Sequence, residues 1–485
     1  MSENSTRAKL ERLFPSPSPA PAPTDRSKDS LHRLEQEVLG DNALAEGELS
    51  VKERLERLVA VTQARPRKTA PPEPGQPGER LALSEAVSGE EVENDFGSFY
   101  SVDEVFPLSH HQGRVPLERL RHVPPEAFSL LSRGDESFEI DLERALFLDT
   151  ETTGLAGGSG TCAFLVGLGF VEDDSFVVRQ LFMRDYDEEA AMLKALGELL
   201  SRFDILLSYN GKSFDIPLLE SRFVLSRQRL SFERMLHFDL LHPARSLWKA
   251  RIESCRLMEL ESRLLGLERE DDVPGHMIPD LYFRFVRTGD ASRIGSVFHH
   301  NRHDILSLAA LTVCASDLLD ENHVPDDPLD DVSLGRLFER ANQPERSMVH
   351  YSRAVEAGVT GVARRRALQA IADQHKRRGD LDDARALWHE LIDENTLESV
   401  YALHELAMVA EHRDGDFNHG VELCDRALAR LEENYDLTLA FRVRWREAFT
   451  HRRQRLERRL RTPEKAMGIE AARRSNTSKE VDDGP

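Results

Sequence analysis

Asp149 and Glu151 are the side chains whose spacing most clearly indicates chemistry. They follow an apolar run at residues 145–148, which is typical of a buried strand that ends at the acids. Because alternate residues of a strand project to the same side, we expect both carboxylates on one face. Hard oxygen ligands of this kind suit Mg²⁺ or Mn²⁺ and not zinc. A lone D-x-E more often marks a solvated turn, but the complete string D-T-E-T-T-G-L argues against that interpretation.

Two further acids lie in strings with similar potential. Asp215 ends N-G-K-S-F-D, which starts at Asn210 and precedes a helical pattern. As a helix cap, Asp215 can still offer an oxygen to a metal. Asp304 follows His299 and His300 in H-H-N-R-H-D. Alone it would be read as a surface residue of a helix, but with the other three acids it completes a set of metal ligands.

The three strings resemble motifs I, II and III of the DEDD superfamily of 3′–5′ exonucleases. The resemblance covers about residues 144–319 and implies a ribonuclease-H-like fold. It also implies two divalent metal ions, Mg²⁺ or Mn²⁺, held by Asp149, Glu151, Asp215 and Asp304. Such a pair of ions activates water and stabilises the departing oxygen of a phosphodiester.

The resemblance leaves two candidates for the general base. The histidine-type pattern of the superfamily, H-x4-D, matches His299, whereas His300 occupies the tyrosine position of the Y-x3-D pattern. Either imidazole has an ordinary pKa near neutrality. The spacing favours His299. His303 is too close to Asp304 along the helix to share its face and is interpreted as a bystander.

Longer strings narrow the resemblance. T-E-T-T-G-L-A-G-G-S-G-T, Y-N-G-K-S-F-D-I-P-L-L, H-F-D-L-L-H-P-A-R-S-L-W and I-P-D-L-Y-F are similar to the YprB-type branch of this superfamily. In these bacterial proteins the exonuclease domain is often followed by tetratricopeptide-like helices. The resemblance says little about the first 80 residues.

Residues near the acids are candidates for substrate binding. We expect Thr152, Thr153, Gly154, Asn210 and Lys212 to approach the nucleotide. Other positions have two interpretations each. The glycine-rich run 157–160 contacts phosphate or only forms a turn, and Asp239 orients the site or a turn or, as the minority interpretation, binds a metal ion directly. Arg245, Lys249 and Arg251 form a basic and aromatic rim with Trp248, unless Trp248 belongs to the core.

The elements around these motifs predict an α/β domain at residues 141–320. Apolar runs predict strands at 145–148, 163–171, 175–182 and 205–209, and a helical period predicts helices at 188–203 and 216–225. Strands come first in a meander and then alternate with helices. This order predicts a mixed, ribonuclease-H-like sheet with flanking helices.

Residues 332–456 predict an all-α domain of helical pairs. Turn residues recur at Asn342, Gly379 and Gly415, and Tyr351 aligns with Trp388, as Ala384 does with Gly420. This spacing predicts a tetratricopeptide-like repeat. Such an array presents a concave surface and indicates a possible protein partner.

The remaining segments have weaker patterns. Residues 1–80 carry two proline-rich patches and predict a disordered tail with one possible short helix. Residues 81–140 predict a small β-rich preface to the nuclease domain. Residues 457–485 predict a basic and then disordered tail.

Composition excludes some classes of protein. The 485-residue chain has no apolar run long enough for a membrane span and no export signal, and its four cysteines form no C-x-x-C pair, so we expect a cytoplasmic protein. The net charge of −22 argues against a protein that coats nucleic acid, and less against a nuclease with bound cations.

Three functional hypotheses remain at this stage. The first is a two-metal 3′–5′ exonuclease on single-stranded RNA or DNA, between which no motif distinguishes. The second is an inert domain on a helical scaffold that recruits proteins. The third is an endonuclease or a hydrolase of very short oligonucleotides. Because an inert domain would not need all four acids, the sequence favours the enzyme.

Overall fold

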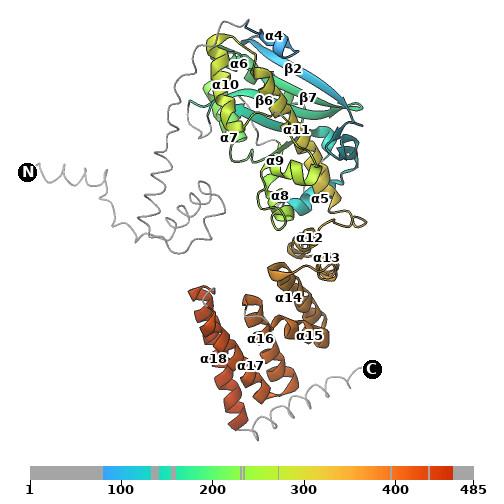
Figure 1. Ribbon diagram of the computed structural model, residues 1–485, viewed down its shortest axis with the longest axis vertical. Coiled ribbons are helices and arrows are strands. Elements are labelled where there is room, and N and C mark those ends of the chain that lie inside the picture. Colours follow the sequence, from blue (N-terminus) through green and yellow to red (C-terminus); the bar gives the residue numbers. More distant parts are fainter. Residues whose placement is uncertain are drawn as a thin grey trace, which may run out of the picture. The chain divides into compact units, whose positions relative to one another are not determined.

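The structure is a computed structural model that describes residues 80–132, 141–154, 160–229, 232, 235–270, 272–393, 396–434 and 437–461 (Figure 1). The predicted N-terminal tail, most of the glycine-rich run at 157–160 and the last residues of the C-terminal tail lie outside this description. Among the described helices, none combines the length and the apolar character that crossing a membrane requires.

A seven-stranded mixed sheet forms the core of the first part, in the order β1-β2-β7-β6-β5-β8-β9. Each pair of neighbours from β1 through β2, β7 and β6 to β5 is antiparallel. Strand β8 then pairs parallel to β5, and β9 pairs parallel to β8. The predicted α/β class with a mixed sheet is therefore confirmed. The strands are β1 (Glu90–Asn94), β2 (Gly97–Pro107), β5 (Ala145–Thr152), β6 (Ala163–Glu172), β7 (Ser175–Phe182), β8 (Ile205–Ser208) and β9 (Leu236–Asp239).

Helices cover this sheet. The longest, α11 (Ile294–Asp317), packs on β5, β6 and β7, and α6 (Glu189–Leu200) packs on β1, β2 and β7. The others are α4 (Leu83–Ala86), α5 (Pro125–Leu131), α7 (Asp215–Leu225), α8 (Leu241–Trp248), α9 (Leu257–Leu260) and α10 (Ile278–Thr288), with short 3-10 or π turns at Leu117–His122, Leu142–Arg144, Tyr186–Glu188, Glu261–Leu265 and Gly275–Met277.

Alternation along β5 decides which side chains meet which helix. Leu146 and Leu148 lie in the core cluster that contains α6, and Phe147 lies in the cluster that contains α11 from Ile305 onward. Successive strand residues face opposite sides, so Asp149 and Glu151 share the α11 side with Phe147.

Two glycines of β6 let α11 approach this side closely. A Cβ atom on Gly167 would lie 2.1 Å from Asn301 Oδ1, and one on Gly169 would lie 2.4 Å from Ile305 Cγ2. The glycines in A-F-L-V-G-L-G-F-V therefore mark the place where the helix backbone crosses the sheet.

The segment predicted as a small β-rich preface contributes strands to the main sheet. Strand β2 pairs with β7 from Tyr100 to Pro107, so β1 and β2 extend the main sheet. Only β3 (His111–Gln112) and β4 (Val115–Pro116) form a small sheet of their own. The described part of the segment 81–140 is thus largely an edge of the same domain.

The second part is helical, as predicted, and is built from successive pairs. Its helices are α12 (Pro328–Arg340), α13 (Pro344–Glu356), α14 (Gly361–Arg378), α15 (Leu381–Leu391), α16 (Leu397–Val409) with a π turn at Ala410–Asp414, α17 (Phe417–Glu433) and α18 (Leu439–Arg461). The turn residues Asn342, Gly379 and Gly415 all have positive φ and each separates the two helices of a pair. The tetratricopeptide assignment stays a prediction.

The helical domain was predicted to start at residue 332, which lies within α12, a helix that contacts the sheet domain. Leu334, Leu337 and Phe338 of α12 belong to the core cluster that contains α8 and α11, and Arg251 forms an ion pair with Asp330 at 3.1 Å. The first helix of the helical region therefore packs on the sheet domain.

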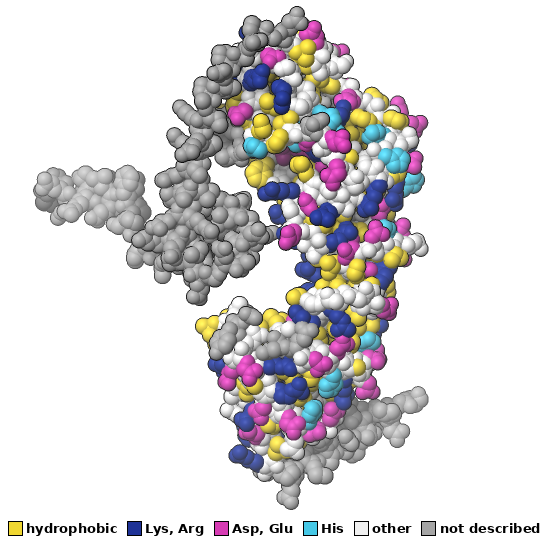
Figure 2. Space-filling model, in the orientation of Figure 1, with side chains coloured by type: hydrophobic (Ala, Val, Ile, Leu, Met, Phe, Trp, Pro, Cys, Tyr) yellow, Lys and Arg dark blue, Asp and Glu magenta, His cyan; other side chains and the backbone are white. Residues whose placement is uncertain are grey.

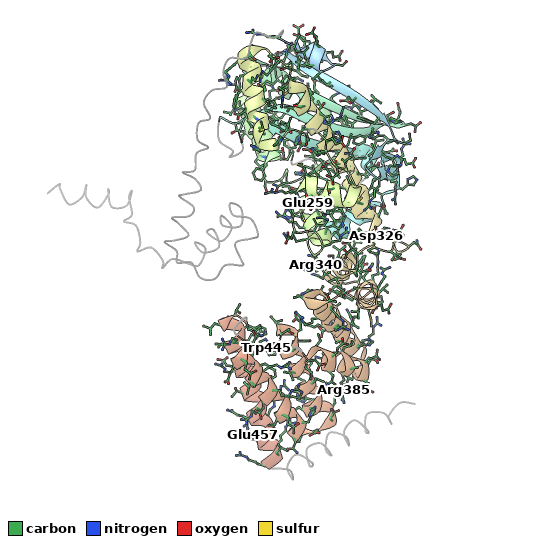
Figure 3. The ribbon with its side chains drawn as sticks, in the orientation of Figure 1. Glu259, Asp326, Arg340, Arg385, Trp445 and Glu457 are labelled. Atoms are coloured by element: carbon green, nitrogen blue, oxygen red, sulfur yellow. The ribbon has the colours of Figure 1, made fainter. Side chains whose placement is uncertain are left out.

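The last helix is fixed by one buried acid. Glu411 accepts hydrogen bonds from Arg452 at 2.7 Å and from Arg455 at 2.7 Å and 2.5 Å. A second ion pair of the helical region joins Arg385 to Asp414 at 2.5 Å. Figure 3 labels Arg385, and also Trp445 of α18. On the face in Figure 2, acidic and basic side chains are interspersed over the described residues.

Candidate metal centre

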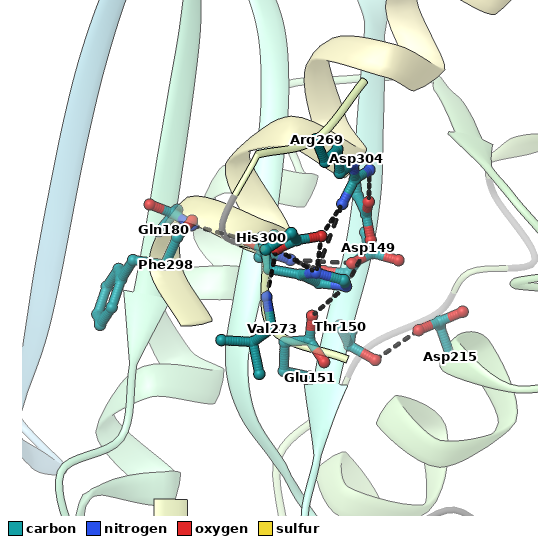
Figure 4. A network of polar contacts seen from close by, with 12 residues as sticks. Asp149, Thr150, Glu151, Gln180, Asp215, Arg269, Val273, Phe298, His300 and Asp304 are labelled. Atoms are coloured by element: carbon teal, nitrogen blue, oxygen red, sulfur yellow. Dashed lines mark hydrogen bonds and ion pairs between the residues drawn. The ribbon is translucent and has the colours of Figure 1, made fainter. Parts of the chain in front are cut away.

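Glu151, His300 and Asp304 meet at the end of β5 (Figure 4). His300 and Asp304 are four residues apart on α11 and therefore share one face of the helix. One ligand atom from each of the three residues lies within 4.8 Å of the others. The His300 Nε2 atom is 3.8 Å from Glu151 Oε1 and 3.6 Å from Asp304 Oδ2.

Asp149 is held beside this cluster by Asn301. The Asn301 amide donates to Asp149 Oδ2 at 2.9 Å, and Asn301 Oδ1 accepts from Gln180 Nε2 at 2.9 Å. Gln180 also donates to the Phe298 carbonyl at 2.9 Å. This buried chain of amides fixes the orientation of the Asp149 carboxylate and leaves its second oxygen free of Asn301.

Asp215 reaches the site from the first turn of α7. It accepts a hydrogen bond from Thr150, which lies between the two acids of β5 (Figure 4). Phe214 occupies the cap position and no side chain caps this helix, so the capping role considered for Asp215 is not the one it has.

The turn before α7 is fixed by Asp239. Its carboxylate accepts from the backbone N–H groups of Asn210 at 2.7 Å, Lys212 at 3.1 Å and Leu241 at 3.0 Å. Asn210 has φ 64°, a conformation that asparagine tolerates. Asp239 therefore orients the turn, one of the two roles expected for it.

Arg269 links the acids from the opposite side. Its side chain is 3% exposed and contacts Glu261 at 2.5 Å, Asp272 at 3.1 Å and Asp304. A buried guanidinium among carboxylates supplies a fixed positive charge with several directed donors. It holds Asp304 Oδ1, while Oδ2 faces His300.

The electrostatics of the cluster favour cation binding. Burial, followed by the charges of Asp304, Asp215 and Glu151, raises the pKa of Asp149 well above its usual range. Burial raises the pKa of Glu151 to about 8, against the opposing charge of His300, and raises that of Asp215 to about 6. Carboxylates that are buried and crowded in this way repel one another, and a bound divalent ion would offset that repulsion.

The two candidate histidines have different surroundings. Burial lowers the pKa of His300, but the hydrogen bond to Asp272 and the charges of Asp304 and Glu151 outweigh it and raise the pKa to about 9. His299 instead packs on His303, with 3.2 Å between their Nε2 atoms, and burial and Arg302 lower its pKa. The structure therefore brings His300, and not the His299 favoured by spacing, to the acids.

The predicted substrate residues have mixed placements. Thr152 Oγ1 donates to the Gly154 carbonyl at 2.9 Å, and Thr153 Oγ1 accepts from the Cys162 N–H at 3.1 Å, so these hydroxyls shape the turn. Lys212 is exposed beside Asn210 on the turn that leads to Asp215.

The basic and aromatic rim is not present as predicted. Trp248 is 2% exposed within the core and cannot stack on a base. Arg251 is engaged with Asp330, while Arg245 and Lys249 are exposed.

Sequence reasoning missed Asn301, Gln180, Arg269, Asp272 and Thr150. Asn301 interrupts the apolar stripe of α11 formed by Val297, Ile305 and Leu308. In the same way, Gln180 stands between Val178 and Phe182 in the series of alternate residues of β7. A polar residue in an apolar period is a usable signal of a buried hydrogen bond. Arg269 and Asp272 lie outside any periodic element and carry no such signal.

The residues present fit the divalent metal ions that the resemblance implies. The donors are four carboxylates, with pKa values raised for three of them, at one end of a sheet, and one imidazole nitrogen directed toward two of them. Oxygen donors bind Mg²⁺ and Mn²⁺, and an added imidazole also suits Mn²⁺.

Comparison with known proteins identifies the superfamily of the sheet domain. Residues 146–316 match a family described as belonging to the RNase_H superfamily, which defines the class of the sheet domain. The chain is 31% identical over 334 residues to the uncharacterized protein YprB of Bacillus subtilis (strain 168), covering 67% of this chain and 79% of that protein. The chain belongs to the YprB family.

A solved structure adds little. The family B DNA polymerase of the hyperthermophilic archaeon Pyrobaculum calidifontis aligns with a TM-score of 0.30 and 17% identity, over 45% of this chain and 30% of the polymerase chain. At this level of similarity it carries no argument about function.

Proposed function

We propose that this protein hydrolyses phosphodiester bonds of single-stranded nucleic acid with two divalent metal ions, most simply as a 3′–5′ exonuclease. Membership of the RNase H superfamily supports nucleic-acid hydrolysis in general. The observation that carries the specific proposal is the meeting of Glu151, His300 and Asp304 in one cluster, with Asp149 and Asp215 close enough for their charges to act on one another.

The chain's own residues would hold the reacting groups in place. When bound, the ions would supply activation of the attacking water and stabilisation of the departing oxygen. Asn301 and Thr150 orient Asp149 and Asp215, and Arg269 orients Asp304. These contacts exist before substrate arrives, so the carboxylates need little reorganisation for catalysis.

The turn that precedes Asp215 offers a surface for the nucleotide. Phe214 is 55% exposed directly beside Asp215, and Lys212 is exposed two residues earlier. An exposed aromatic ring can stack on any base, and a lysine can meet phosphate. We propose that these two residues hold the terminal nucleotides of a single strand.

The experiment uses 5′-labelled single-stranded RNA and DNA, each with Mn²⁺, Mg²⁺ or EDTA. We expect a metal-dependent ladder that shortens from the 3′ end, absent in Asp149→Asn and retained in the exposed-acid control Asp280→Asn. Substrates with a blocked 3′ end distinguish the modes, because an endonuclease still cuts them. If the folded protein cleaves neither nucleic acid with either metal, the proposal fails in favour of a scaffold that recruits protein partners through its helical region.

A further inference from the structure

The imidazole of His300 faces two carboxylates without forming a hydrogen bond to either. Its Nε2 atom is 3.8 Å from Glu151 Oε1 and 3.6 Å from Asp304 Oδ2, beyond hydrogen-bond distance. Ligands of a small divalent ion lie about 2.1 Å from it, so two of them are roughly 3 to 3.5 Å apart. The observed separations are close to those of donors that share one ion.

The other ring nitrogen is held by a carboxylate. His300 Nδ1 lies 2.8 Å and 3.0 Å from the two oxygens of Asp272. Asp272 is itself fixed by Arg269 at 3.1 Å and by the Val273 N–H at 2.9 Å. Because an ionised carboxylate only accepts, Nδ1 carries a hydrogen, and when a metal ion displaces the proton from Nε2 the lone pair of that atom faces Glu151 and Asp304.

This order of groups is the one found behind metal-bound histidines. A histidine ligand usually donates its second N–H to a carboxylate, which fixes the tautomer and the ring orientation. Imidazole nitrogen favours manganese and later transition ions over magnesium, which keeps oxygen ligands.

We propose that His300 is a ligand of one of the two divalent ions through Nε2, together with Glu151 and Asp304, that Asp272 is its positioning residue, and that the site prefers Mn²⁺ to Mg²⁺. This inference rests on the proposed metal centre and deepens it. It replaces the role of general base for His300 with metal ligation.

Pulsed electron paramagnetic resonance of the full-length protein tests the ligand directly, with Mn²⁺ alone as probe at less than one ion per chain. We expect ¹⁴N modulation from a coordinated imidazole, replaced by the ¹⁵N pattern in protein made with ¹⁵N-histidine. The signal should be lost in His300→Gln. It should be kept in His299→Gln, because the imidazole of His299 contacts His303 and not the acids. The isotope measurement does not depend on whether a variant folds.

Calorimetric titration with each metal gives a second readout. His300→Gln should weaken Mn²⁺ binding about tenfold or more and leave Mg²⁺ binding little changed, and Asp272→Ala should weaken Mn²⁺ binding more than Asp272→Asn. Bound Mn²⁺ without nitrogen coupling, or coupling that survives in His300→Gln, overturns the inference while leaving the proposed nuclease intact. Coupling in a protein that cleaves no nucleic acid overturns the proposed function and leaves the ligand standing.

Discussion

Asn301 donates to Asp149 across the contact between α11 and β5, and its own carbonyl accepts from Gln180. One side chain thus joins the longest helix to the strand that carries two of the acids. Because all its polar atoms are engaged and it is fully buried, Asn301 has no substitute of equal shape that keeps both bonds.

Replacing Asn301 should therefore damage both stability and metal binding. Asn301→Leu leaves Asp149 Oδ2 without its donor, which costs about 1–3 kcal/mol, while Gln180 Nε2 keeps the Phe298 carbonyl as its acceptor. The loss of orientation at Asp149 should weaken metal binding by about 10- to 100-fold. Urea unfolding and Mn²⁺ titration measure the two effects. Wild-type metal affinity in a folded Asn301→Leu protein would show that Asn301 does not orient the site.

Gly167 should tolerate no side chain. Its added Cβ would lie 2.1 Å from Asn301 Oδ1, so Gly167→Ala must displace the amide that holds Asp149. We expect a loss of about 1–3 kcal/mol in the free energy of unfolding, together with weaker metal binding. Gly275→Ala is the matched control, because nothing lies within 4 Å of its added Cβ. Equal melting temperatures for the two variants would contradict the close approach of α11.

The metal-free protein should lose stability as the pH rises. The folded-state pKa is raised to about 8 for Glu151 and about 6 for Asp215. A carboxyl with a raised pKa binds its proton more tightly in the native state, so its contribution is complete below the unfolded pKa and disappears as the pH rises through the folded value. Between about pH 5 and pH 8 the melting temperature of the metal-free protein should fall.

Added Mn²⁺ should counter this fall, and increasingly so at higher pH, because the ion displaces protons from the same carboxylates. Thermal unfolding with EDTA or Mn²⁺ across this pH range measures both trends. The double variant Glu151→Gln with Asp215→Asn should flatten the metal-free curve. A stabilisation by Mn²⁺ that does not depend on pH would place the ion away from these acids.

Phe214 should contribute to substrate binding more than to turnover. Stacking of one base on an aromatic ring is worth about 1–3 kcal/mol, so Phe214→Ala should raise KM about fivefold or more with a smaller effect on kcat. Leu225→Ala provides the control, since Leu225 is 59% exposed at the other end of the same helix. Steady-state kinetics on a short single-stranded substrate separates the two parameters, and an unchanged KM would remove Phe214 from the binding surface.

Glu411 should be essential for the last helix. It is buried beneath Arg452 and Arg455, so Glu411→Gln removes the charge that both guanidinium groups need. Breaking a buried ion pair at one partner typically costs about 3–5 kcal/mol. Limited proteolysis and thermal unfolding should show early loss of α18, whereas Glu422→Gln, at an exposed acid of α17, should behave as wild type. Equal protease resistance of the two variants would show that the ion pairs of Glu411 are not needed to hold α18.

Much of the sheet domain could be predicted because its signals are local. The strands at 145–152, 163–172 and 175–182 follow from apolar runs interrupted by acidic turns, and D-x-E at the end of one of them places both acids on one face. The turns at Asn342, Gly379 and Gly415 were predicted for a similar reason, since a positive φ selects for these residue types.

Helical geometry decides which of the two histidines faces Asp304. On one continuous helix His299 is about 140° around the axis from Asp304, whereas His300 is about 40° away. The pattern H-x4-D favoured His299 because it counts positions along the chain, whereas in the continuous helix α11 the angle around the axis decides which ring faces Asp304. Arg269, Asp272 and the addition of β1 and β2 to the sheet could not be predicted, because they depend on contacts between segments far apart in the chain.

The late position of α11 in the chain decides when the metal centre is completed during synthesis. Asp149 and Glu151 leave the ribosome long before Asn301 and Asp304, since Asn301 is 152 positions after Asp149 in the chain. Until α11 has been synthesised, the strand acids lack both the amide that orients one of them and the carboxylate that completes the cluster. A nascent chain that stops short of α11 therefore carries two acids of the metal centre without its function, and the site matures only after the whole sheet has been formed.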